Sequence, residues 1–167
     1  MEYTKADIFQ AEAVMNQMRN AIYHLARFMK ANKRTNVEER LRQMGRNIAK
    51  TMSNYWQPVD KVTLSNLKDF LTTVYQKILN SNISIEVQDN LLTVVDNKCA
   101  LCKYHYEDIE IAGCEIILGL VCELVDLINK ESAIPSRINL SPLRVEKSRA
   151  YGHSDCVQVF KIELGGN

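Results

Sequence analysis

The chain has 167 residues, of which 46% are hydrophobic and 25% charged, and its formal net charge is +1. These values are typical of an ordinary globular protein that folds as one domain. They exclude the class of strongly basic nucleic-acid binders, which carry a larger positive excess and a recognisable module. The longest apolar run, near residues 116–128, is interrupted by Glu123 and Asp126, so it is too short and too charged to span a membrane. Because residues 1–5 also lack the pattern of a signal peptide, we expect a cytoplasmic protein.

The first helical pattern covers residues 6–31. Its apolar residues recur at steps of three and four, which predicts one apolar stripe: Ile8, Ala11, Met15, Met18, Ile22, Leu25 and Met29, widened by Phe9, Val14, Ala21 and Phe28. Methionine fills irregular contacts, so the stripe suits a helix–helix interface. An ordinary intramolecular core accounts for the same pattern, and the sequence leaves both interpretations open.

Two further helices follow in the first half of the chain. Asn36 is a suitable N-cap for a helix over residues 37–52, and Thr63 for a helix over residues 64–79. Gly45 lies inside the first of these at a cost of about 1 kcal/mol relative to alanine. A glycine in that position indicates the close approach of another helix.

The second half of the chain alternates between strand and helix patterns. It predicts a helix at 110–129 and short strands at 83–87, 91–95, 99–106, 143–148 and 156–164. The order predicts an α+β fold in which a four-helix layer packs on a small antiparallel sheet. We expect one domain over 1–167, with a helical part at 1–80 and the sheet, the last helix and a closing hairpin at 81–164.

Five cysteines, an odd number, in a chain without a secretory signal argue against a disulfide framework. Cys99 and Cys102, with His105, have a metal-like spacing, but in a strand the two thiols would point to opposite faces. Cys114 and Cys156 are weak metal candidates, because two thiolates do not complete the four-ligand shell of zinc. We therefore predict no metal and no cofactor. The chain also lacks the glycine-rich and nucleophile motifs of common enzyme classes, and we expect a protein that is not an enzyme.

Two stretches resemble known families. Residues 9–52 resemble the N-terminal helices of the small core subunits of the TRAPP tethering complex, through Phe9–Phe28, Val37-Glu38-Glu39 and Met44-Gly45-Arg46-Asn47-Ile48 with Met52. Residues 113–163 are similar to the 4-vinyl-reductase domain, a relative of the same fold, through Gly113-Cys114, Gly119, Cys122-Glu123, Glu146, Gly152-His153 and Cys156. This mixture of features suits a prokaryotic, archaeal relative of the tethering subunits.

The sequence lacks some of the residues that bind zinc in 4-vinyl-reductase domains or carry an acyl chain in TRAPP subunits. Several 4-vinyl-reductase domains bind zinc through cysteines and a glutamate; Cys114 and Cys156 match two of those positions, whereas Ser148 and Val145 stand where a cysteine and the glutamate would. Some TRAPP subunits carry an acylated cysteine after the second helix, and residues 53–70 contain none. An apolar pocket that holds a hydrophobic molecule without a covalent bond is still compatible with the fold.

The resemblance implies a non-enzymatic module for vesicle or membrane tethering, which forms a homodimer or a heterodimer with related subunits and meets a small GTPase. We assign the dimer interface to apolar and small residues of the first two helices: Met15, Met18, Ile22, Leu25, Met44, Gly45 and Ile48. The alternative is a ligand-binding sensor of the 4-vinyl-reductase type that holds a hydrophobic molecule or a metal.

Charge is unevenly spread along the chain. Residues 1–50 hold ten Lys or Arg but five Asp or Glu. Arg42, Arg46 and Lys50 are four residues apart, so they share a helix face. This ridge predicts peripheral contact with an anionic membrane or an acidic partner, and an ordinary solvated helix face is the alternative.

Overall fold

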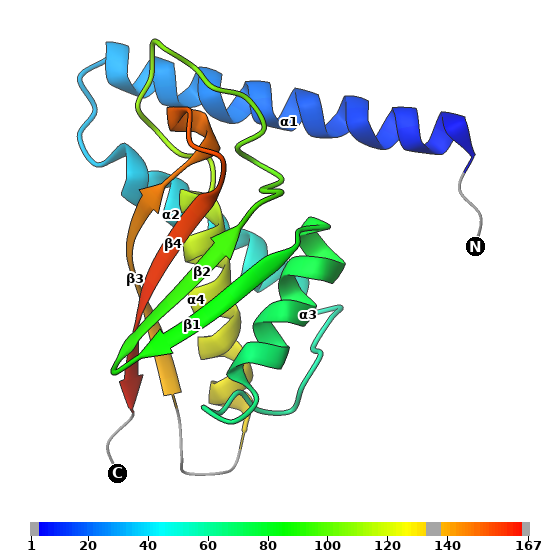
Figure 1. Cartoon of the computed structure of the whole chain (residues 1–167), viewed down its shortest axis with the longest axis vertical. Coiled ribbons are helices and arrows are strands. Elements are labelled where there is room, and N and C mark those ends of the chain that lie inside the picture. Colours follow the sequence, from blue (N-terminus) through cyan, green and yellow to red (C-terminus); the bar gives the residue numbers. More distant parts are fainter. Residues whose placement is uncertain (1–3, 133–137, 165–167) are drawn as a thin grey trace. The chain divides into compact units, whose positions relative to one another are not determined.

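The computed structural model describes residues 4–132 and 138–164. Its helices are α1 (Lys5–Ala31), α2 (Val37–Ser53), α3 (Leu67–Leu79) and α4 (Glu115–Glu131). Its strands are β1 (Ile83–Gln88), β2 (Leu91–Asp96), β3 (Ile138–Lys147) and β4 (Cys156–Leu164), and a 3-10 turn, η1 (Arg149–Tyr151), precedes β4 (Figure 1). The predicted α+β class, with four helices and a small antiparallel sheet, is confirmed.

The chain divides into two compact units. Residues 1–37 contain α1, and residues 38–167 contain the sheet and the other helices. The boundary falls inside the helical part that the sequence analysis placed at 1–80. Each unit is therefore described by itself. Among the described residues, no helix has the length and apolar character needed to cross a membrane.

The sheet is antiparallel throughout, in the order β1-β2-β4-β3. Side chains alternate across it, so that Leu92 and Val94 of β2 share a buried face with Phe160 of β4. Helix α4 packs on β3 and α3 on β1, and α4 lies behind the strands in Figure 1. The core of this unit therefore lies between one face of the sheet and these helices.

Four predicted elements differ from the structure by more than one residue. The helix predicted at 110–129 is α4, which begins at Glu115 and ends at Glu131. The predicted strand at 99–106 is wrong, because the segment from 97 to 114 contains neither helix nor strand. The predicted strand at 143–148 is too short: β3 begins at Ile138 and runs through Pro142, which an edge strand tolerates beside the register shift at Pro142/Arg144. Helix α3 begins at Leu67 because Asn66, rather than Thr63, is its N-cap residue.

Helices α2 and α4 cross backbone to backbone. A Cβ atom added to Gly45 would overlap the carbonyl oxygen of Ile116 and lie 2.7 Å from the amide nitrogen of Leu120. A Cβ atom added to Gly119 would overlap the carbonyl oxygen of Arg42. The predicted packing role of Gly45 is confirmed, and its partner is a helix of the same chain. The sequence analysis assigned Gly45 to a dimer interface. In the structure its open face is covered by α4 of the same chain.

Replacing either crossing glycine tests this packing. We expect Gly45→Ala and Gly119→Ala each to lower the free energy of unfolding by about 1–3 kcal/mol, because backbone atoms cannot move aside as a flexible side chain can. Urea titration monitored by circular dichroism measures the change. Arg40→Ala, at an exposed position of α2, is the control and should stay close to wild type. Equal stability of the glycine variants and the control would show that the helices are further apart.

Candidate functional site

Four cysteines meet in the interior of the larger unit. The sulfur atoms of Cys99, Cys102, Cys114 and Cys156 all lie within 4.8 Å of one another, and all four residues are buried. Thiolate sulfur is a preferred ligand of zinc and other soft metals. This cluster is the strongest candidate for a functional site in the part of the chain that the structure describes.

Three separate segments supply the four thiols. Cys99 and Cys102 lie in the segment that follows β2, Cys114 is the N-cap residue of α4, and Cys156 is the first residue of β4. Cys156 is paired with Asp96, the last residue of β2, in the sheet register. The end of the sheet and the start of α4 therefore meet at the cluster.

Backbone amides point at two of the sulfurs. The amide of Cys114 donates a hydrogen bond to the Sγ of Cys102 at 3.3 Å, and the amide of Arg149 donates to the Sγ of Cys156 at 3.4 Å. The Oγ of Ser148 lies 3.6 Å from the Sγ of Cys156 and accepts a hydrogen bond from the amide of Ala150. Such donors favour the negatively charged form of sulfur.

The thiols also act on one another. Burial opposes ionisation of Cys102, but S–H donation from Cys114, Cys156 and Cys99 outweighs it and holds the pKa of Cys102 well below its ordinary value. The pKa of Cys114 is well above its ordinary value, mainly because its proton is shared with Cys102 and then with Cys156. Even without a metal, the cluster is arranged to hold a thiolate.

The sequence analysis did not identify this cluster because it placed Cys99 and Cys102 in a strand. A strand would send their side chains to opposite faces, whereas the irregular segment turns both toward Cys114. The spacing of Cys99 and Cys102 was the signal that identified this pair. Among the positions implied by the 4-vinyl-reductase resemblance, Ser148 contacts the cluster, and Val145 is not one of its members.

Three buried polar residues lie near the cluster: Tyr75 of α3, Asp96 of β2 and Gln158 of β4. The Tyr75 hydroxyl donates to the side-chain oxygen of Gln158 at 2.5 Å. Asp96 is fully buried, and burial raises the pKa of its carboxyl group. Side-chain atoms Asp96 Oδ2 and Gln158 Nε2 have no partner among the described residues. We assign no role to these three residues.

A surface hollow of the larger unit has a mixed polar and aromatic lining. It is lined by His105, Tyr106, Glu107, Glu110 and Tyr151, and the Nδ1 of His105 lies 2.8 Å from the carbonyl oxygen of Ala150. Carboxylates and a histidine do not make an apolar lining. The hydrophobic pocket expected from the resemblance therefore stays a prediction.

An ion pair lies at the crossing of α2 and α4. The Nε of Arg42 lies 2.6 Å from a carboxylate oxygen of Glu115, and the guanidinium also donates to the carbonyl oxygen of Leu143 at 3.2 Å. The Glu115 side chain is 5% exposed. Burial raises the pKa of Glu115, and Arg42 opposes that shift. Arg42 therefore joins α2 to α4 and β3 rather than extending freely into solvent.

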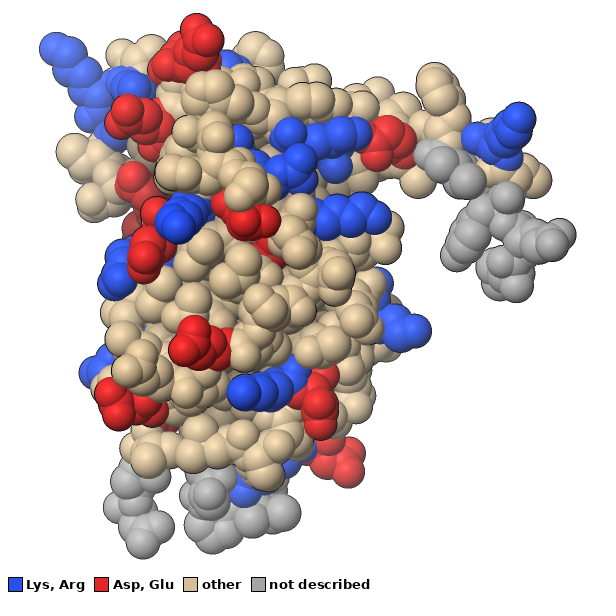
Figure 2. Space-filling model, viewed as in Figure 1, with Lys and Arg blue, Asp and Glu red and all other residues tan. Residues whose placement is uncertain are grey.

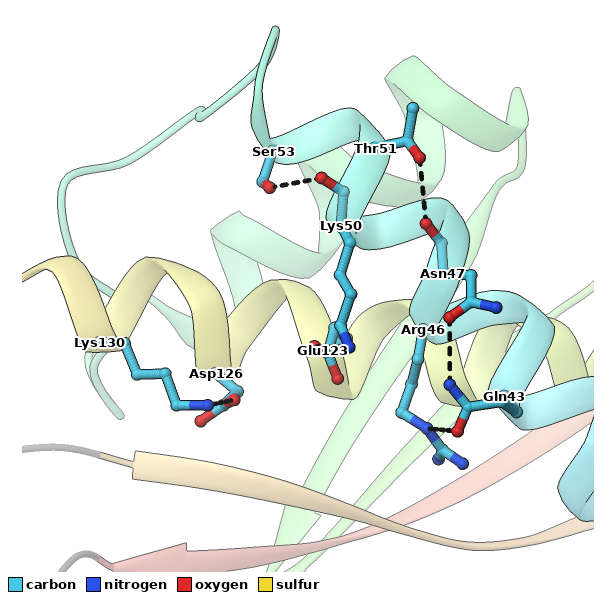
Figure 3. A network of polar contacts seen from close by, with 9 residues as sticks. All are labelled: Gln43, Arg46, Asn47, Lys50, Thr51, Ser53, Glu123, Asp126 and Lys130. Atoms are coloured by element: carbon cyan, nitrogen blue, oxygen red, sulfur yellow. Dashed lines mark hydrogen bonds and ion pairs between the residues drawn. The ribbon is translucent and has the colours of Figure 1, made fainter.

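The other members of the predicted basic ridge are also paired. Arg46 pairs with Glu39. Arg46 also donates to Gln43 at 3.0 Å, and the Nζ of Lys50 lies 3.5 Å from a carboxylate oxygen of Glu123 of α4 (Figure 3). Basic and acidic side chains are interspersed on the face drawn in Figure 2. Contact of the ridge with a membrane or an acidic partner stays a prediction, and the pairing leaves less free positive charge than the sequence suggested.

The predicted interface residues fall into two groups by exposure. Met18 and Leu25 of α1 are 46% and 41% exposed, and Ile48 of α2 is 38% exposed. Ile22 is buried, and Met15 and Met44 are half-buried. The exposed members are the ones available to a second subunit.

Comparison with known proteins gives a likeness in fold. No family model matches the chain, and no curated protein matches its sequence. The chain is similar to the crystal structure of a trafficking protein particle complex subunit 3 from Naegleria fowleri covalently bound to palmitic acid, with a TM-score of 0.63 and 11% sequence identity. The match covers 93% of this chain and 99% of that chain. The chain therefore has a TRAPP-like fold, and its likeness to 4-vinyl-reductase domains stays a prediction.

The Arg42–Glu115 pair generates a prediction about stability and pH. Replacing Arg42 by methionine leaves a buried carboxylate without its partner, which we expect to cost about 3–5 kcal/mol near neutral pH. Arg46→Met is the matched control, because it removes a pair with the exposed Glu39 and should cost less than about 1 kcal/mol. Urea unfolding of both variants gives the two values.

The loss should depend on pH in a defined direction. In Arg42→Met, burial keeps the pKa of Glu115 above that of the unfolded chain, about 4.3. The folded state then binds more protons than the unfolded state above that pH, so stability is greatest in acid and falls as the pH rises through the folded pKa. A variant that is equally destabilised at pH 4 and pH 8 would show that Glu115 is not the cause.

Proposed function

We propose that this chain is a non-enzymatic assembly subunit that pairs with a second copy of itself through α1. The fold shared with a trafficking complex subunit supports this class of function. The observation that carries the proposal is an apolar seam, exposed along α1, that matches the pattern of a helix-pairing surface. A subunit of this kind would act as a scaffold of a cytoplasmic tethering complex.

The α1 seam is defined by residues at alternating steps of three and four: Ala11, Val14, Met18, Ala21, Leu25 and Phe28. This spacing is the heptad repeat by which two helices interlock. Phe28 is 65% exposed and Val14 is 48% exposed, and the two alanines are exposed as well. A contiguous exposed apolar stripe of this kind marks an interaction surface.

The structure separates this seam from the rest of the apolar stripe predicted by sequence. Tyr23 and Ala26, on another side of the helix, are buried, and so is Ile22, which borders the seam one turn after Met18. Alanine at two of the six seam positions allows close approach of a second helix, and the larger residues supply contact area. A second copy of α1 offers the same spacing and is therefore a complementary partner.

The proposal does not extend to a small GTPase or a membrane. The cations expected to face a membrane or an acidic partner, Arg42, Arg46 and Lys50, are all engaged with carboxylates, and no described feature singles out a GTPase-binding surface. One observation favours a second candidate function, a sensor domain that binds a ligand or metal: the cluster of four buried cysteines.

Charge placed in the seam should separate the subunits. We expect the wild-type chain to be a dimer by sedimentation equilibrium at micromolar concentration, and Met18→Glu/Leu25→Glu to be a monomer, because burying unpaired carboxylates is costly. Glutamate is a good helix former, so circular dichroism should show unchanged helix content.

The matched control is Asn20→Glu, which adds a carboxylate at an exposed position of α1 outside the seam and should leave the dimer intact. A monomeric wild-type chain would contradict pairing through a second copy. A dimer that persists in the double variant would place the interface elsewhere.

A further inference from the structure

We propose that Cys99, Cys102, Cys114 and Cys156 bind one zinc ion in a closed tetrahedral site. The inference is independent of the assembly function, because it concerns the interior of residues 38–167 and not the α1 seam. It reverses the negative expectation drawn from sequence, which counted only two thiolates at Cys114 and Cys156 and placed Cys99 and Cys102 in a strand that the structure does not contain.

The geometry fits one metal ion. Zinc–sulfur bonds of about 2.3 Å in a tetrahedron place the sulfurs about 3.8 Å apart. The four sulfurs already lie within 4.8 Å of one another, so small side-chain rotations complete the tetrahedron. An iron–sulfur cluster holds several metal atoms between its cysteines and needs more space than this.

The surroundings suit thiolates better than neutral thiols. Backbone amides donate to the sulfurs of Cys102 and Cys156, which are the outer contacts that orient metal ligands and offset their charge. Cys114 stands at the N-terminus of α4, a helix of 17 residues, where the dipole favours negative charge. An apolar core built only for packing would not need these donors.

The character of the donors indicates a structural zinc site. Four thiolates leave no open position for water or substrate, as in structural rather than catalytic sites. Each zinc–sulfur bond replaces an S–H bond, and the proton passes to solvent, so binding involves no change in oxidation state.

The ion would join three parts of the unit. The segment between β2 and α4, residues 97–114, has no regular secondary structure of its own. Zinc would fasten Cys99 and Cys102 of this segment to Cys114, at the start of α4, and to Cys156, the first residue of β4, which is distant in sequence. Long irregular segments inside compact domains need such a restraint or a functional reason.

The test is the metal content of the purified full-length chain. We expect one zinc per chain by elemental analysis of wild type, and loss of the ion in Cys102→Ser and Cys114→Ser. Cys122→Ser is the matched control, because Cys122 is a buried free cysteine of α4 outside the cluster, and it should keep one zinc. Cobalt added to the chelator-treated wild type should give the intense visible bands of a tetrahedral thiolate site.

Wild type alone can overturn the proposal, so a variant that fails to fold does not leave it undecided. Reduced, folded wild type that contains no metal and gives no tetrahedral cobalt spectrum would contradict the site. One iron per chain in place of zinc would contradict the assignment of the metal, and zinc that is lost equally from Cys122→Ser would contradict the assignment of the ligands.

Discussion

The contact between Gly45 of α2 and Gly119 of α4 is the constraint on which the rest of the larger unit depends. With no side chain on either helix at the crossing, the backbones touch, and the carbonyl oxygens of Ile116 and Arg42 lie where Cβ atoms would otherwise be. That approach sets the position of the first turn of α4. Glu115 belongs to that turn and Cys114 is its N-cap residue. The crossing therefore positions both the Arg42–Glu115 ion pair and the cysteine cluster.

Two buried polar side chains of this unit, those of Glu115 and Asn129, are held by partners at the junctions between elements. Glu115 is reached by Arg42 of α2, and Asn129 of α4 accepts a hydrogen bond from the amide of Val62 and donates to the carbonyl oxygen of Ile138. The contacts of Arg42 with Glu115 and of Val62 with Asn129 tie a helix to a segment far away in sequence. Because an unpaired buried polar group is costly, these contacts select one arrangement of helices and sheet among those that apolar packing alone would allow.

The cysteine cluster and the α1 seam differ in exposure: the cluster is buried, whereas the seam is exposed. In the larger unit, four thiols are gathered in the interior, where a metal ion would satisfy them. On α1, the residues from Ala11 to Phe28 that form the seam are exposed, and in the proposed dimer the second copy would cover them. A buried metal that stabilises the unit and an exposed helix that pairs it with a partner are compatible parts of one assembly protein.

The sequence by itself determined the elements with strong periodicity. The stripes of α1 and α2 and the alternation of β1 and β2 predicted those elements nearly to the residue, since helix and strand periods are local properties. Gly45 also predicted a close helix approach, because a glycine within a helix is costly without one. The α+β class followed from the order of these patterns.

Only the tertiary structure decided which distant residues meet. The segment predicted as a strand at 99–106 is irregular. Its residues Cys99, Leu101 and Cys102 are buried without the alternation of a strand, and a short apolar run in the sequence does not distinguish a strand from a buried irregular segment. The partner of Gly45, the pairing of Arg42 with Glu115 and the convergence of Cys99, Cys102, Cys114 and Cys156 all join segments separated by many residues. No local pattern records such contacts, because they arise from the way that the sheet, α2 and α4 pack together.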